Sequence, residues 1–327
     1  MGRIGVCTIL WKAPFCWNVK KEDVEYWSRI EMERSLEIPE KIRKFTEGTM
    51  ARLAAMNLSD FINEELAEPA GYLLKNRGKL LRPALVFLGA DYIGAEDIER
   101  YTGIAEAVEL LHTSSLVHDD IIDKDMIRRG RPSTNARFGN EAAILAGNAL
   151  ISRAIQSASP YGSEVVEAIS KTAMKMCAGE MLDFKYQNMG GVPKIEEYIK
   201  AAGLKSSSLI GTSTSIAAIY DHDKKSSELY EFGFLLGTAF QIRDDIIDFS
   251  GEFLRGKRRL NIVNCMMESY SIGREEAMLK ASEMNVRYVE DAISKLSDEE
   301  SSDLFVSYAE KVAVRKNEIE SLAVESE

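Results

Sequence analysis

The chain has 327 residues, of which 45% are hydrophobic and 28% are charged, and its net charge is −11. This composition is that of a globular protein with a substantial core, and the acidic balance argues against a general nucleic-acid binder, which needs surplus Lys and Arg. No stretch approaches the roughly 20 apolar residues that a membrane span requires.

The first 20 residues contain one apolar run, 4–11, broken by Lys12 and Pro14 and without a small-residue cleavage site. We interpret them as an N-terminal extension rather than a signal peptide. Residues 21–327 contain no linker rich in Pro, Gly or Ser, so one domain is expected. A reducing, cytoplasmic compartment and no zinc site are expected, because no CxxC pair occurs among the four cysteines, Cys7, Cys16, Cys177 and Cys265.

Helical periodicity dominates the chain. Apolar side chains recur at spacings of three and four from Ile104 through Val108 to Leu111, which keeps them on one helix face. Besides this helix, the pattern predicts helices over 59–75, 79–94, 137–159, 163–187, 194–219, 226–249, 273–297 and 299–323. Short breakers rich in Gly and Pro separate them, and no segment alternates with period two. We therefore predict an all-α, single-domain bundle of about ten helices.

Two aspartate clusters stand out, HDDIID at 118–123 and RDDIID at 243–248. On a helix, residues four apart project from one face. Asp119 and Asp123 therefore share one helix face, and so do Asp244 and Asp248. Asp120 and Asp245 project in a different direction. A single cluster of this kind is equally well a solvated acidic patch.

The surroundings of the clusters favour a metal site. Apolar stripes precede both, so each cluster is expected to end a helix whose other face is buried. Crowded carboxylates raise each other's pKa unless a cation joins them. Oxygen ligands suit magnesium or manganese, and magnesium is commonly held by one or two carboxylates together with substrate phosphates. Two clusters facing each other predict a metal-bridged diphosphate site.

Basic residues flank the first cluster, as a diphosphate site requires. Arg128 and Arg129 follow it, and Lys79 and Arg82 precede it. Arginine suits bidentate phosphate contacts, whereas lysine acts as a point charge. An Arg-Arg pair by itself is usually only a solvated surface feature, so the inference depends on the combination with the aspartates.

The combined segments resemble the trans-polyprenyl diphosphate synthases of the geranylgeranyl or longer-chain type. The similarity covers about residues 60–262, and the segments that carry it are GKLLRP at 78–83, ELLHTSSLVHDDIID at 109–123, RRGRPS at 128–133, LKSSSL at 204–209 and FQIRDDIIDFSG at 240–251. The resemblance implies helices around a deep central cavity, a homodimer, and head-to-tail condensation of an allylic diphosphate with isopentenyl diphosphate. It also implies that the departing diphosphate takes the proton.

The resemblance implies roles for individual residues. Three magnesium ions, or manganese in their place, would be coordinated by Asp119, Asp123 and Asp244, with Asp120, Asp245 and Asp248 supporting them. Ser206 would stabilise the carbocation through its hydroxyl or carbonyl. Isopentenyl diphosphate would bind Lys79, Arg82, His112 and Arg129, and the allylic diphosphate would bind Arg128, Lys205, Gln241 and Lys257.

Product length is expected to depend on the helix that ends in the first cluster. The hydrocarbon would run from Asp119 towards the N-terminus of this helix, past Ser115, Leu111 and Val108, with Ser114 alongside. One helical turn of about 5.4 Å is close to one extended isoprene unit. The first layer of side chains, one helical turn from Asp119, contains Ser114 and Ser115. Because both are small, they leave room for the hydrocarbon, and a product of twenty or more carbons is predicted.

Two departures keep alternatives open. The loop after Asp248 is shorter than is usual in the family and keeps one Gly-Lys pair, at Lys257, and Glu180 stands where the family commonly has Gln. A non-catalytic subunit of a heteromeric synthase therefore remains possible, although both clusters are complete. A terpene cyclase is disfavoured by Lys79, Arg82 and Arg129, since a cyclase has no second diphosphate to hold.

Overall fold

The computed structural model describes residues 38–75, 80–253, 261–297 and 299–314, so the extension predicted for residues 1–20 lies outside them. Residues from Ile38 onward form one unit. The only sheet within the described ranges is the antiparallel pair β1 (Ile127–Arg128) and β2 (Arg131–Pro132), which flanks a turn at Arg129 and Gly130. The predicted all-α class is confirmed.

The remaining regular elements are helical. In chain order they are α2 (Glu40–Ala54), α3 (Leu58–Phe61), α4 (Glu64–Leu74), α5 (Leu81–Tyr92), η1 (Ile98–Tyr101), α6 (Thr102–Ile122), α7 (Thr134–Phe138), α8 (Asn140–Ala158), η2 (Ser159–Tyr161), α9 (Ser163–Asn188), α10 (Ile195–Ala202), η3 (Gly203–Ser207), α11 (Ser208–Tyr220), α12 (Ser226–Phe253), α13 (Ile262–Tyr270), α14 (Arg274–Ile293) and α15 (Glu299–Glu310). No helix in the described part of the chain is both long and apolar enough to cross a membrane.

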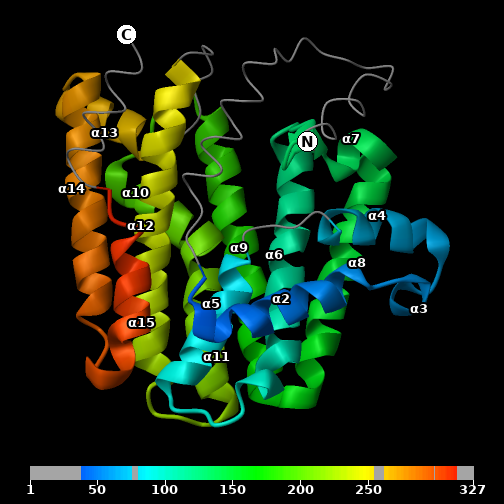
Figure 1. Ribbon diagram of the computed structural model, residues 1–327. Coiled ribbons are helices and arrows are strands. Elements are labelled where there is room, and N and C mark those ends of the chain that lie inside the picture. The colour runs from blue at the N-terminus through cyan, green and yellow to red at the C-terminus, as the bar shows by residue number, and fades with distance from the viewer. Residues whose placement is uncertain (1–37, 76–79, 254–260, 298, 315–327) are drawn as a thin grey trace, which may run out of the picture. The chain divides into compact units, whose positions relative to one another are not determined.

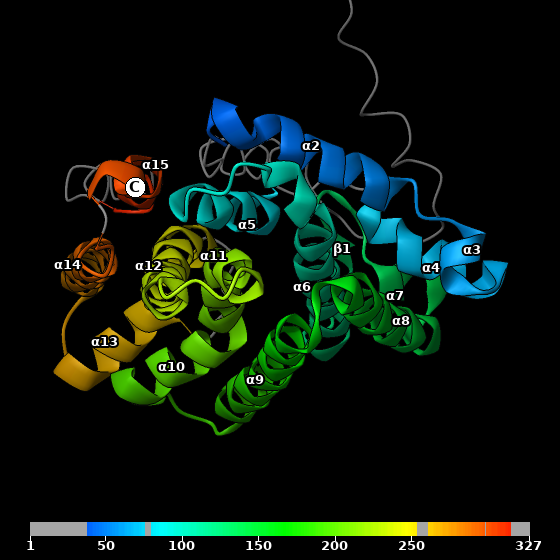
Figure 2. The ribbon, with the colours of Figure 1, turned by 90° about the horizontal axis from the view of Figure 1, so that it is seen from below.

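The direction of the long helices brings the two aspartate clusters to one end of the bundle. Figure 1 shows α6, α9 and α12 running upwards and α8 and α11 running downwards. Helix α6 packs against α8, and α11 packs against both α5 and α12. Figure 2, along the helices, shows α11 between α5 and α12. Because both clusters lie near the C-terminal ends of parallel helices, they face the same end of the molecule.

Three predicted helices differ in extent from the observed ones. The helix predicted over 59–75 is divided, because Ile62 has a φ of 75° and the side chain of Asn63 accepts a hydrogen bond from Leu66 N to begin α4. The helix predicted over 299–323 ends at Glu310. Beyond it the chain turns back onto α14, where Val314 N donates to Asn285 Oδ1 at 2.7 Å.

The third difference lies beside the site. The segment predicted as one helix over 194–219 contains the π-helical turn η3 between α10 and α11. Turns of this kind inside α-helices frequently occur at functional sites. A Cβ atom on Gly179 of α9 would lie 2.2 Å from the Lys205 backbone nitrogen. The absence of a side chain at Gly179 therefore allows η3 to press against α9 and places Lys205 beside that helix.

Candidate active site

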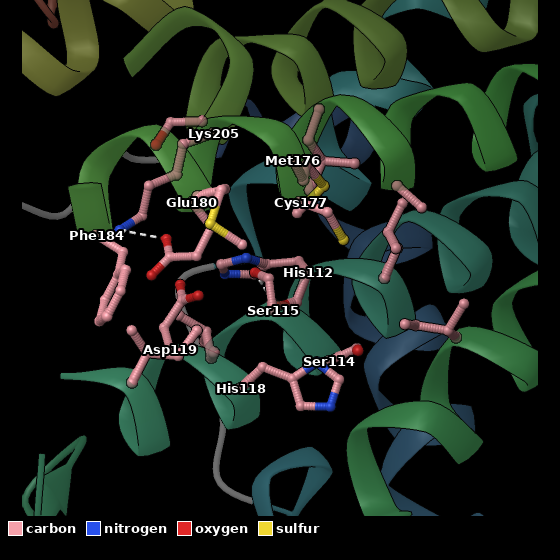
Figure 3. A pocket seen from close by; sticks show the side chains of 18 of the residues that line it. His112, Ser114, Ser115, His118, Asp119, Met176, Cys177, Glu180, Phe184 and Lys205 are labelled. Carbon is pink, nitrogen blue, oxygen red and sulfur yellow. Dashed lines mark hydrogen bonds and ion pairs between the residues drawn. The ribbon is translucent and has the colours of Figure 1, made fainter. Parts of the chain in front are cut away.

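A cavity of about 540 Å³ opens between α6, α9 and η3, a size typical of small-molecule sites. Figure 3 shows its wall. Helix α6 contributes Leu111, His112, Ser114, Ser115, Leu116, His118, Asp119 and Ile122; α9 contributes Ala173, Met176, Cys177, Glu180, Met181 and Phe184; Arg82, Ile151, Lys205, Ser206 and Leu209 complete the lining.

The contribution of α9 was not predicted from the sequence. Its lining residues recur at spacings of three and four along one face, from Ala173 to Phe184. That spacing is present in the sequence, but Met and Phe at helical spacing are as typical of a packed core as of a cavity wall. Only the arrangement in space shows that this face lines an open volume.

Charged and apolar lining residues occupy different parts of the cavity. Figure 3 shows Lys205, Glu180 and Asp119 close together on one side, while Met176 and Cys177 lie on the other. His112 and Ser115 lie between them. The cavity therefore offers charges to a polar head group and an apolar volume to a hydrocarbon.

Lys205 is the centre of the charged side. Its Nζ donates to Asp183 Oδ2 at 2.5 Å and lies 2.7 Å from Glu180 Oε2. Burial lowers the pKa of Lys205, but the carboxylates of Asp183, Asp119 and Glu180 outweigh this effect and raise the pKa above its ordinary value. The ammonium group is therefore charged, and it is available to an anion only in competition with these carboxylates.

Asp119 carries an unfavourable charge in the absence of a cation. Burial raises its pKa to about 7; Lys205 opposes the shift, and Glu180 and Asp123 add to it. Asp123 lies one turn further along, at the C-terminal cap of α6. A divalent cation would relieve the repulsion between these carboxylates.

Asp120 points away from the cavity and anchors the segment after α6. It is fully buried and accepts a hydrogen bond from Arg128 Nε at 2.8 Å, reinforced by a second contact from the same guanidinium group. Asn135 donates to its backbone carbonyl. Asp120 thus fixes Arg128 beside the first cluster, a supporting role, and is not among the lining residues.

Asp245 has the same place in the second cluster. It is buried and accepts hydrogen bonds from Tyr198 Oη, from Gln241 Nε2 at 2.9 Å and from Ile262 N at 2.7 Å. Burial is the main cause that raises its pKa to about 7. Asp245 therefore joins α12 to α10 and to the start of α13.

Arg82 and His112 form a second group of donors. Arg82 Nη1 lies 3.0 Å from His112 Nε2. Burial, with Arg82 and Arg129, holds the pKa of His112 well below its ordinary value. The imidazole is therefore neutral, its Nε2 accepts from Arg82, and its Nδ1 carries the proton. Two further predicted residues of the substrate set, Lys79 and Lys257, lie outside the described residues.

The second cluster is linked to the cavity through its neighbours. Ser206 Oγ donates to Gln241 Oε1 at 3.1 Å, and Gln241 in turn donates to Asp245. Asp244 interacts electrostatically with Arg82. Asp244 and Asp248 are half-buried and are not among the cavity-lining residues.

The donor set fits a cation that brings its own ligands. Within the described ranges, no three His, Cys, Asp or Glu side chains are close enough to enclose a metal ion. Asp119 and Asp123 nevertheless offer carboxylates one helical turn apart, and burial together with the nearby carboxylates raises the pKa of Asp119, so a cation beside it would stabilise its charged form. Magnesium, held by a few carboxylates and completed by substrate phosphates and water, matches this arrangement.

Three of the four predicted product-length residues line the cavity. Ser115, Ser114 and Leu111 do so, whereas Val108 is fully buried and is not a lining residue. Ser115 Oγ donates to His112 O within its own helix, but Ser114 Oγ donates to Gly147 O of α8 at 2.9 Å. Ser114 therefore also joins α6 to α8.

The fold and the site together define a class of protein. Parallel helices that present charged donors at one end of an apolar cavity are the arrangement of the isoprenoid synthase type. The chain belongs to the polyprenyl synthetase family, whose model matches residues 63–259. By family it is a prenyltransferase, as the sequence motifs predict.

Individual relatives support the assignment. The chain is 33% identical over 246 residues to a geranylgeranyl diphosphate synthase of Methanosarcina mazei, covering 68% of this chain and 75% of that protein. It is 35% identical over 208 residues to a geranylfarnesyl diphosphate synthase of the same organism, covering 62% and 69%. A solved geranylgeranyl pyrophosphate synthetase from Geoglobus acetivorans is similar with a TM-score of 0.74 and 28% identity, covering 85% of this chain and 100% of that one.

The buried carboxylate of Asp119 predicts a pH-dependent stability in metal-free protein. Because its folded pKa of about 7 lies above the value of an unfolded aspartate, its stabilising contribution is complete below about pH 4 and is lost as the pH rises through about 7. We expect Asp119→Asn to be more stable than the wild type at pH 8 by about 1–3 kcal/mol, with a smaller gap at pH 5. Urea unfolding at both pH values measures this; an equal gap at both would contradict it.

Proposed function

We propose that the protein condenses an allylic diphosphate with isopentenyl diphosphate, head to tail, to a polyprenyl diphosphate of twenty or more carbons. The observation that carries the proposal is the single cavity in which Lys205 and Asp119 adjoin an apolar volume lined by small residues of α6. The names of two relatives agree with it, because geranylgeranyl and geranylfarnesyl diphosphates have prenyl chains of twenty and twenty-five carbons.

The allylic diphosphate would bind at the charged side of the cavity. Lys205 and Arg128 donate to its oxygens, and both are held in place by carboxylates, Lys205 by Asp183 and Arg128 by Asp120. Magnesium held by Asp119, Asp123 and Asp244, when bound, would neutralise the charge that develops on the leaving diphosphate. Fixed cations that are oriented before the reaction stabilise such a charge without reorganisation.

The carbocation formed by ionisation would lie beside η3. Ser206 Oγ donates a hydrogen bond to Gln241 Oε1, so the lone pairs of the hydroxyl oxygen can face a positive charge. The apolar wall formed by residues such as Met176 and Leu209 keeps water from capturing the cation. The departing diphosphate takes the proton that the condensed product loses, so no side chain near the cavity needs to act as base.

Isopentenyl diphosphate would bind the second group of donors. Arg82, the neutral His112 and Arg129 provide a positive group separate from Lys205. This group supports a synthase over a terpene cyclase, because a cyclase has only one diphosphate to hold. The contributions of Lys79 and Lys257 remain a prediction from the sequence.

A homodimer is part of the proposal. Large apolar side chains on α8 and α9 are exposed, among them Ile144 at 46%, Leu145 at 60% and Met174 at 73%. An exposed apolar surface of this kind is typical of an interface. A second copy of this chain, or in a heteromeric synthase a different subunit, would cover it.

Product analysis tests the proposed activity. Purified protein is incubated with magnesium, isopentenyl diphosphate and allylic primers of ten to twenty carbons, and the dephosphorylated products are separated by chain length. We expect elongation to products of at least twenty carbons and none with EDTA. A folded protein that makes no product with any primer would instead be a non-catalytic subunit, and consumption of a primer without isopentenyl diphosphate would indicate a cyclase.

A bulky residue at Ser115 is expected to shorten the product. Ser115 faces the cavity and makes only a local hydrogen bond, so Ser115→Phe should fill the first layer and shift the main product down by at least one isoprene unit of five carbons. Ser114→Phe should shorten it too, but with lower stability, because it removes the bond to α8. An unchanged product distribution for Ser115→Phe would refute the role of this helix in measuring chain length.

A further inference from the structure

Glu180 is a charged residue of the cavity to which the proposed reaction gives no task. It lies on α9, with 12% of its side chain exposed, and it lines the cavity on the side of Asp119. Figure 3 shows the carboxylates of Glu180 and Asp119 pointing towards each other, with the Lys205 ammonium group adjacent to Glu180. Burial is the main cause that raises the pKa of Glu180, and Lys205 opposes the shift.

The two carboxylates that hold Lys205 do so in different ways. Asp183 accepts a directed hydrogen bond from Lys205 Nζ. Glu180 Oε2 lies 2.7 Å from the same nitrogen, in a direction less favourable for a hydrogen bond than that of Asp183. Asp183 therefore makes the shorter and better-directed contact with the ammonium group, and Glu180 is the partner more easily displaced.

We propose that Glu180 is a positioning residue that competes with the allylic diphosphate for Lys205. The inference rests on the proposed function. In the unliganded protein Glu180 and Asp183 together balance the ammonium charge; when a diphosphate binds, Lys205 keeps Asp183 and exchanges Glu180 for a phosphate oxygen. Glu180 thereby weakens diphosphate binding at the site that ionises.

Weaker binding has a use in a reaction that repeats. After each condensation, inorganic diphosphate must leave this side of the cavity before the lengthened chain can take its place. A carboxylate that returns to Lys205 promotes this exchange, and it also promotes release of the finished product. An interaction that strengthens binding of the ground state and the transition state equally lowers KM without raising kcat, so loss of the competitor should lower KM and slow the exchange.

Glu180→Gln tests the inference, because it removes the charge and keeps the shape. The matched control is Glu167→Gln, which removes the same charge from an exposed Glu-Lys pair on the same helix, where Glu167 Oε1 lies 2.5 Å from Lys171 Nζ. The probe is inorganic diphosphate with magnesium, titrated calorimetrically into the full chain. We expect Glu180→Gln to bind it about 3- to 10-fold more tightly than the wild type, the factor of a partly exposed ion pair, and Glu167→Gln to be unchanged.

Steady-state rates supply a second readout. Glu180→Gln should lower the KM for the allylic diphosphate and lower kcat, while the KM for isopentenyl diphosphate stays the same. Unchanged diphosphate affinity would overturn the inference and leave Glu180 a structural residue. Weaker affinity would overturn it in the other direction and make Glu180 a ligand of the metal. In both cases a wild type that forms product keeps the proposed function intact, whereas a folded wild type without product would refute that function.

Discussion

The site depends on one ammonium group placed among three carboxylates. Lys205 lies on the π-helical turn η3, is bound by Asp183 and Glu180 of α9, and acts electrostatically on Asp119 of α6. Burial raises the pKa of Asp119 to about 7, and the ammonium group, shared among three carboxylates, only partly opposes this shift. The unliganded protein thus crowds carboxylates at the proposed diphosphate site. Divalent cations arriving with the substrate would relieve this repulsion.

The repeated aspartate motif serves the fold and the site at once. In each cluster the middle aspartate is buried and binds the segment that follows. Asp120 accepts a hydrogen bond from Arg128, and Asp245 accepts one from Ile262 N. The outer aspartates stay near the charged end of the bundle. A substitution of the middle residue would therefore reduce activity through misplaced neighbours, even though that residue does not line the cavity.

Sequence periodicity predicted the long helices well because their apolar residues recur at spacings of three and four. It also placed Asp119, Ser114, Ser115 and Leu111 on the helix that lines the cavity. It did not reveal that α9 forms the opposite wall, because its stripe from Ala173 to Phe184 is the same whether a helix faces a core or an open volume. The division at Ile62 and the π-helical turn at Gly203–Ser207 depend on caps and on contacts with distant helices, which no local pattern records.

A binding measurement without turnover tests most directly whether the Asp119 side of the cavity is a metal-dependent diphosphate site. An allylic thiolodiphosphate, whose carbon–sulfur bond does not ionise, is titrated into the protein with magnesium and with EDTA. We expect one analogue per chain, bound more than tenfold more tightly with magnesium, a difference above about 1.4 kcal/mol. Equal affinity under the two conditions would contradict a site whose surplus carboxylates are neutralised only by the metal.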